Sequence, residues 1–275
     1  MKDAVVFFIF LVLLTCPAED GLPSRMYIWN VGQGQWLTWV RPSDCVHFDM
    51  GGEVAPLKRI RELCHRKKNY VYLTHADMDH IKFLTWGLYN LFDLCLMTLP
   101  REHLSSRKAR LIEGVPRCHG VHSIQILSHE IIELTEQKKF FNSKTKSKNR
   151  SNIQQTTYPR ISIPTVPDAN LLSHVFVAKS PFGGILVSGD SPQRAEKIWA
   201  FDLPLGIDKY ILGHHGSRTS TSDYLLQHLP QLKFAISSAR KKRYGHPHIE
   251  VIRKLLEQNI PLLQTEKWGN FSFYL

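Results

Sequence analysis

One short segment limits what this chain can fold into more than any other: an apolar run that ends in a dense group of polar side chains. The run Tyr70-Val-Tyr-Leu73 predicts a buried strand. Two imidazoles and two carboxylates follow it, at His75, Asp77, Asp79 and His80. Such groups at the end of a buried strand cost free energy unless something pairs with them, and a divalent cation is the natural partner. Mixed His and Asp ligands suit zinc, with manganese or iron as alternatives. The segment therefore favours a metal centre over a solvated loop.

Three further polar clusters follow predicted strands later in the chain. Ser188-Gly-Asp190 ends an apolar run, and its carboxylate is placed either to bridge two cations or to cap the helix that begins near Pro192. Gly213-His-His-Gly-Ser217 holds two adjacent histidines between glycines, which suits one metal ligand and one contact with substrate; two exposed loop histidines are the alternative. His246 precedes the last helix and is a candidate final ligand.

Hydrophobic periodicity divides the chain into strands and helices. We expect strands over residues 26–31, 36–40, 45–49, 69–74, 94–99, 123–127, 172–178, 184–188, 209–212, 233–237, 261–264 and 270–274, and helices over 54–66, 79–89, 101–112, 192–201, 222–229 and 247–258. The first three strands form an antiparallel meander, whereas the second half alternates strand with helix. Two mixed sheets with helices outside satisfy both halves and bring the polar clusters to one edge.

The N-terminal residues indicate export. Residues 1–18 combine a short leading segment, an apolar run and small residues, as in a cleaved signal peptide; a lipidated Cys16 and an uncleaved anchor are the alternatives, and the apolar run is too short for a stable membrane span. In an exported protein, disulfides are expected among the other cysteines, whose pairing the sequence leaves open: Cys45, Cys64, Cys95 and Cys118.

The charge of the chain favours anionic partners. Of 275 residues, 43% are hydrophobic, which suffices for one large domain, and the formal net charge is +11. Such an excess suits nucleic acid, phosphorylated glycans or an acidic membrane surface. Residues 136–165 carry several lysines among polar residues and predict a flexible basic insertion. The four cations Arg240, Lys241, Lys242 and Arg243 would attract a polyanion, with a solvated turn as the alternative.

Six motifs, taken in order, resemble the metallo-β-lactamase-fold hydrolases of the ComEC type, whose domain follows a membrane channel in bacterial competence proteins. The motifs are Asn30-Val-Gly-Gln-Gly34, Asp49-Met-Gly-Gly52, His75-x-Asp-x-Asp-His80, Ser188-Gly-Asp190, Gly213-His-His-Gly-Ser217 and Tyr244-Gly-His-Pro-His248. The resemblance covers residues 26–275. It implies an αββα sandwich, a four-layer α/β (α+β) fold of two mixed sheets with outer helices, and one or two metal ions at its edge.

The resemblance also implies roles for individual residues. His75 and Asp77 would hold a first zinc or manganese ion, Asp79 and His80 a second, Asp190 would bridge them, and His246 matches the last ligand. His214 and His215 match the family's paired histidines. The chain departs from the family at Asn30 and Gln35, where two acids have become amides, and at Lys82-Phe83 in place of Gly-Gly. The separate middle histidine of lactamase-type enzymes has no clear counterpart.

These residues together predict metal-assisted hydrolysis of a phosphoester, possible substrates being DNA or another anionic phosphoester. The catalytic candidates are Asp79, His214 and His215, and the substrate-binding candidates are Lys82, Ser217, Arg240, Lys241, Lys242 and Arg243. Aromatics such as Trp36 or Tyr244 would stack on the bases of a single strand. The alternatives are an envelope phosphodiesterase acting on a phosphorylcholine or teichoic-type substrate, and a non-catalytic protein that binds an anionic polymer.

Overall fold

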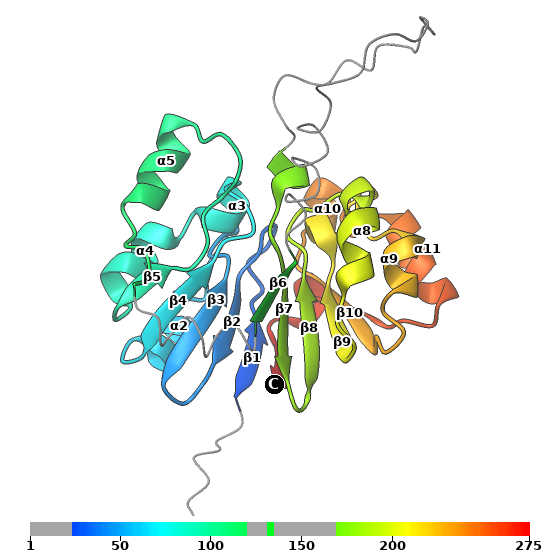
Figure 1. Ribbon diagram of the computed structural model, residues 1–275, viewed down its shortest axis with the longest axis horizontal. Coiled ribbons are helices and arrows are strands. Elements are labelled where there is room, and N and C mark those ends of the chain that lie inside the picture. Colours follow the sequence, from blue (N-terminus) through cyan, green and yellow to red (C-terminus); the bar gives the residue numbers. More distant parts are fainter. Residues whose placement is uncertain (1–23, 120–130, 135–168) are drawn as a thin grey trace, which may run out of the picture.

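Two six-stranded sheets lie face to face at the centre of the protein, with helices on both outer sides (Figure 1). The computed structural model describes residues 24–119, 131–134 and 169–275. The predicted signal peptide at 1–18, the strand at 123–127 and the basic insertion at 136–165 lie outside the described residues. No helix in the described part is long and apolar enough to cross a membrane.

The first sheet contains most of the N-terminal half and the last strand of the chain. Its order is β12-β1-β2-β3-β4-β5. The strands are β1 (Arg25–Ile28), β2 (Leu37–Val40), β3 (Asp44–Phe48), β4 (Lys68–Tyr72), β5 (Leu94–Leu96) and β12 (Phe271–Tyr274). Strands β1 to β3 form the predicted antiparallel meander, and β3, β4 and β5 are parallel. The outer helices of this half are α2 (Leu57–Cys64), α3 (Met78–Ile81), α4 (Leu84–Asn90) and α5 (Ser106–Glu113).

The second sheet has the order β11-β10-β9-β8-β7-β6. Its strands are β6 (Ile131–Leu134), β7 (Val175–Ser180), β8 (Gly183–Val187), β9 (Ile207–Ile211), β10 (Phe234–Ser237) and β11 (Leu262–Gln264). Strands β7 and β8 form the expected hairpin, and β8, β9, β10 and β11 are parallel. The helices of this half are α8 (Gln193–Trp199), α9 (Asp223–Gln227), α10 (Lys241–Tyr244), α11 (Ile249–Glu257) and α12 (Thr265–Trp268), with short 3-10 turns η1 (Ala169–Leu172), η2 (Ala200–Asp202) and η3 (Gly213–Gly216).

The layers are held together by apolar side chains on each face of both sheets. Between the sheets, Met26, Ile28 and Phe48 of the first pack in one cluster with Phe176 and Val187 of the second. Each outer face has its own cluster, with Ile60 of α2 and Leu84 of α4 on the first sheet. Trp199, Leu225 and Leu255 bring α8, α9 and α11 onto the second sheet. The predicted four-layer αββα sandwich is therefore confirmed.

Three local details differ from the expected elements. The helix expected over 79–89 is two helices, α3 and α4, separated at Lys82 and Phe83. The basic run at 240–243 is not a turn: Arg240 precedes α10, the other three residues lie in it, and the helix ends before Gly245, which is in the left-handed region (φ 73°). Strand β6 was not expected, because its four residues are too few to show a period.

Two disulfides settle the pairing that the sequence left open. Cys45 in β3 is bonded to Cys64 at the end of α2, and Cys95 in β5 is bonded to Cys118. Both bridges lie in the N-terminal half: one ties β3 to α2, and the other ties β5 to the segment that runs beside it at Arg117. Bridges of this kind form and persist in oxidising compartments.

The order of parallel strands brings the polar clusters together. Asp49 follows β3, the cluster at 75–80 follows β4, Asp190 follows β8, and the paired histidines follow β9. The carboxyl ends of parallel strands meet at one edge, and side chains placed after them converge there. Helices α3 and α10 lie at this same end of the two sheets (Figure 1).

Candidate metal centre

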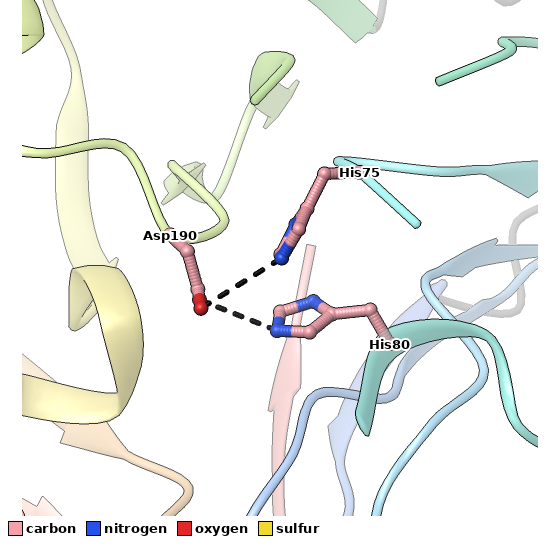
Figure 2. Close-up of side chains that lie close together, drawn as sticks. All are labelled: His75, His80 and Asp190. Carbon is pink, nitrogen blue, oxygen red and sulfur yellow. Dashed lines mark ion pairs between the residues drawn. The ribbon is translucent and has the colours of Figure 1, made fainter. Parts of the chain in front are cut away.

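Asp190 lies at the centre of the cluster, and its two carboxylate oxygens face different partners. His75 and His80 both point toward it from the first half of the chain (Figure 2). Oδ1 is 3.2 Å from Nε2 of His80 and 3.7 Å from Nε2 of His215. Oδ2 is 3.7 Å from Nε2 of His75 and 3.5 Å from Nε2 of His214. One carboxylate is thus shared between two sets of potential ligands.

Each set is completed by one carboxylate of the segment after β4. Oδ2 of Asp79 is 3.2 Å from Nε2 of His215, which is itself 3.3 Å from Nε2 of His80. We call Asp79, His80, His215 and Oδ1 of Asp190 the His80 half. Oδ2 of Asp77 is 3.6 Å from Nε2 of His75. We call His75, Asp77, His214 and Oδ2 of Asp190 the His75 half.

Backbone geometry brings these segments into contact. Asp77 is the residue before α3, so that Asp79 and His80 lie in the first turn of that helix. His214 and His215 both have left-handed φ values, 49° and 58°, an unusual conformation for residues with a side chain. The amide of His214 donates to the carbonyl of Gly189 at 2.9 Å, which ties the histidine pair to Asp190. Gly51 is required beside α3, because a Cβ there would lie 2.1 Å from the carbonyl oxygen of Asp79.

Asp49 was not among the predicted site residues, yet it organises the histidines. This fully buried carboxylate accepts hydrogen bonds from Thr74 N (2.8 Å), Thr74 Oγ1 (2.7 Å), Gln35 Nε2 (2.7 Å) and His80 Nδ1 (2.7 Å). Since the Thr74 hydroxyl donates to Asp49, it can accept from Nδ1 of His75 at 3.0 Å. In the neutral form that a metal ion requires, both histidines then carry their proton on Nδ1 and direct a lone pair on Nε2 toward Asp190. The available signal was an acid directly after a strand, within the motif at 49–52.

The electrostatics of the cluster favour a cation. Burial opposes ionisation of Asp190, but the charges of His80, His215 and His75 overcome it and hold its pKa well below the usual value. The pKa of Asp79 is also lowered: burial opposes this shift, and the hydrogen bond and charge of His215 with the charge of His80 outweigh it. Burial lowers the pKa of His80, yet Asp190 and Asp49 raise it well above normal. The two carboxylates thus stabilise positive charge at His80.

Unpartnered polar atoms fit a metal ion in the same place. Among the described residues, His75 Nε2 and Asp190 Oδ1 are buried side-chain atoms without a hydrogen-bond partner. Ligand atoms of His75, His80 and Asp190 lie within 4.8 Å of one another, as do those of Asp79, His80 and His215. Imidazole nitrogens and carboxylate oxygens are donors that zinc and manganese accept. The residues present therefore fit a divalent cation, and the two groups have His80 in common.

The remaining ligand candidate, His246, stands beside this cluster. Its ring centroid is 5.9 Å from that of His214, and its Nδ1 is 3.4 Å from Nε2 of Gln33. Burial and the charges of His215 and His214 lower its pKa to about 4, so that it is neutral at pH 7.

The substrate-binding candidates lie in different surroundings. Lys82 and Arg243 line a pocket of about 380 Å³ together with Asp79 and Tyr244. Arg240, Lys242 and Arg243 line a neighbouring pocket of about 620 Å³. Ser217 is buried, and its Oγ lies 3.0 Å from Oγ1 of Thr219. Lys241 is exposed at the start of α10.

Glu53 joins the basic residues of the two pockets. It forms ion pairs at 2.9 Å with both Arg240 and Arg243, and its carbonyl accepts from Lys82 at 3.2 Å. Of the two aromatics expected to stack on bases, Tyr244 is 43% exposed, but Trp36 is 1% exposed and packs against Phe83. The prediction for Trp36 was therefore wrong, because the break between α3 and α4 places Phe83 over its ring.

Comparison with known proteins gives two sequence relatives. The chain is 25% identical over 205 residues to ComE operon protein 3 of Bacillus subtilis (strain 168), a stretch that covers 73% of this chain and 24% of that protein. It is 37% identical over 86 residues to Recombination protein 2 of Haemophilus influenzae, which covers 31% of this chain and 11% of that protein. The chain thus spans a quarter or less of the length of these relatives. No family model matches the chain.

One solved structure is similar in overall shape, a protein described as a new diphosphatase from the PhnP family. It aligns with 92% of this chain and 98% of its own, with a TM-score of 0.46 and 12% identity. The two sequence matches confirm the resemblance to ComEC-type proteins of the metallo-β-lactamase fold that the ordered motifs indicated.

Proposed function

We propose that this protein is a metal-dependent phosphodiesterase or nuclease that cleaves DNA or another anionic phosphoester. The observation that carries the proposal is the position of Asp190, whose two oxygens are shared between two sets of histidine and aspartate ligands. One carboxylate between two such sets is suited to two-ion phosphoester chemistry. Zinc is the metal we expect, with manganese as the alternative.

The metal would supply Lewis-acid activation of water and of the phosphoryl group. The side chains of the protein then have distinct tasks. Asp79 is ionised, lies at the rim of the pocket with Lys82, and can accept the proton of the attacking water. Lys82 and the partly exposed His214 can stabilise negative charge on the phosphoryl oxygens or the leaving oxygen. His215 is buried among the ligand atoms, so we assign it to metal binding.

The basic pockets support an anionic polymer as substrate. The two pockets share Arg243, and one of them reaches Asp79. A phosphate backbone could therefore extend from the metal centre along α10. Tyr244 offers an exposed ring at the rim on which a base could stack. Binding through these cations should weaken steeply with salt. Because of the two disulfides, we also propose that the chain works outside the reducing cytosol.

The test combines metal analysis with activity. We expect the purified protein to contain zinc or manganese and to cleave single-stranded DNA or bis-p-nitrophenyl phosphate, with loss of activity in EDTA. Asp79→Asn and Asp190→Asn should abolish cleavage because each removes a charge from the ligand cluster. Asp93→Asn is the matched control, since Asp93 is exposed and pairs with Lys68 at 3.3 Å. Equal activity in wild type and both cluster variants would refute the mechanism.

Two additional measurements, DNA binding and hydrolysis of phosphorylcholine esters, separate the alternative functions. A non-catalytic protein that binds an anionic polymer should bind DNA without holding stoichiometric metal. An envelope phosphodiesterase should hydrolyse phosphorylcholine esters faster than DNA, and its activity should depend little on Arg240 and Arg243.

A further inference from the structure

Lys108 occupies one carboxylate of the proposed metal centre. Its Nζ lies 2.6 Å from Oδ1 of Asp77, and the two side chains are 24% and 39% exposed. Lys108 lies in the first turn of α5, a helix that packs near α3, so its ammonium group comes from an element outside the motif. Asp77 is thus a candidate metal ligand whose charge is already paired with the ammonium group of Lys108.

The two halves of the centre therefore differ in charge although they match in ligand types. In the His75 half, Lys108 balances Asp77. In the His80 half, Asp79 contacts His215, and the nearby lysine, Lys82, donates to the carbonyl oxygen of Glu53. Asp49 adds a further negative charge behind His80. A dication is attracted by the sum of the charges around it, so its affinity should be higher in the His80 half.

We propose that the ammonium group of Lys108 neutralises Asp77 and thereby weakens metal binding in the His75 half. The protein then binds one ion tightly in the His80 half and a second ion in the His75 half only at higher metal concentration. The His75 half still has a ligand atom free to bind a second ion: Nε2 of His75 is fully buried and has no hydrogen-bond partner among the described residues. The ligands of the second ion are thus present but are partly neutralised. The protein would then change from a one-ion to a two-ion state according to the supply of free metal.

This inference rests on the metal centre of the proposed function, and the experiment separates the two. Metal-free protein is titrated with Zn²⁺ alone and, separately, Mn²⁺ alone, and binding is followed by calorimetry and by metal analysis after gel filtration. For wild type we expect one equivalent to survive gel filtration and a second, weaker binding event. Lys108→Met should strengthen the second event at least about tenfold, since it removes a positive charge beside the ion.

Two controls test whether charge at this position is the cause. Lys108→Arg keeps the cation and should titrate like wild type. Arg110→Met removes a charge from an exposed position of the same helix and should also titrate like wild type. Methionine is a good helix former, so α5 should persist in both methionine variants. As a separate check, Asp77→Asn should leave the tight ion in place, whereas Asp79→Asn should remove it.

The outcomes have different meanings. Two ions bound with equal affinity by wild type, or an unchanged second event in Lys108→Met, would overturn the role of Lys108 and leave the metal centre standing. Loss of the tight ion in Asp77→Asn but not in Asp79→Asn would also overturn the role of Lys108, because the tight ion would then be bound in the His75 half. Wild type that binds no ion at all would overturn the metal centre and the proposed function together.

Discussion

Replacing Asp49 by asparagine should weaken metal binding even though Asp49 does not face the cluster itself. Oδ1 of Asp49 accepts from the amide of Thr74, which cannot reverse its direction, so the asparagine must keep its oxygen there. Its NH₂ group then takes the place of Oδ2 and faces three former donors: Gln35 Nε2, Thr74 Oγ1 and His80 Nδ1.

The size of the effect follows from how each of these donors can respond. Gln35 can turn its amide over, and the hydroxyl of Thr74 can rotate. His80 can accept from the new NH₂ only if its proton moves to Nε2, the atom that faces Asp190. That proton blocks a ligand lone pair, and losing such support typically costs about 10- to 100-fold in metal affinity. Loss of the charge-assisted bonds should also lower the free energy of unfolding by about 2 kcal/mol.

Calorimetric zinc titration and urea unfolding of the metal-free protein measure the two effects separately. Asp208→Asn is the control, because Asp208 is also buried and accepts from Lys209 Nζ at 2.6 Å and Gly184 N at 3.2 Å, in another part of the second sheet. It should lose stability and keep its affinity for zinc. Unchanged zinc affinity in Asp49→Asn would refute the argument that Asp49 sets the proton position on His80.

Two further predictions concern stability. Burial lowers the pKa of His47 to about 4, so the unfolded chain, with an ordinary histidine pKa near 6.5, binds more protons than the folded one between these values. The free energy of unfolding should therefore fall as the pH drops from about 6.5 to 4, by about 3 kcal/mol from this residue. Urea unfolding across this range should show a smaller fall for His47→Asn than for wild type. An equal dependence on pH in the two proteins would contradict the lowered pKa of His47. Replacing Cys45 and Cys64 together by serine opens a loop whose ends are 19 residues apart and should cost about 3 kcal/mol by the chain-entropy relation. The melting temperature of this double variant should lie between those of oxidised and fully reduced wild type, because the bridge between Cys95 and Cys118 remains. An unchanged melting temperature would show that the bridge between Cys45 and Cys64 adds no stability.

Local pattern was sufficient to predict most elements of the fold. The meander of β1 to β3, the hairpin of β7 and β8 and the alternating strands and helices after residue 190 all lie close to their expected ranges. These elements have strong periods of two or 3.6 residues, which neighbouring side chains display directly. The break between α3 and α4 was missed, since Lys82 and Phe83 are compatible with a helix. In the structure, Phe83 directly precedes α4 and stacks on Trp36.

For the candidate metal centre, the sequence by itself determined which chemical groups follow which strands, and the ordered motifs indicated the candidate ligands. Only the tertiary structure decided how those groups are shared. The contact of His80 with His215 joins residues 135 positions apart, and the ion pair of Lys108 with Asp77 joins α5 to the residue that precedes α3. Neither contact produces a periodic pattern in the sequence, because both depend on the order of strands in the sheets and on which helix covers which edge. The support from Asp49 and the pairing of the four cysteines were undetermined for the same reason.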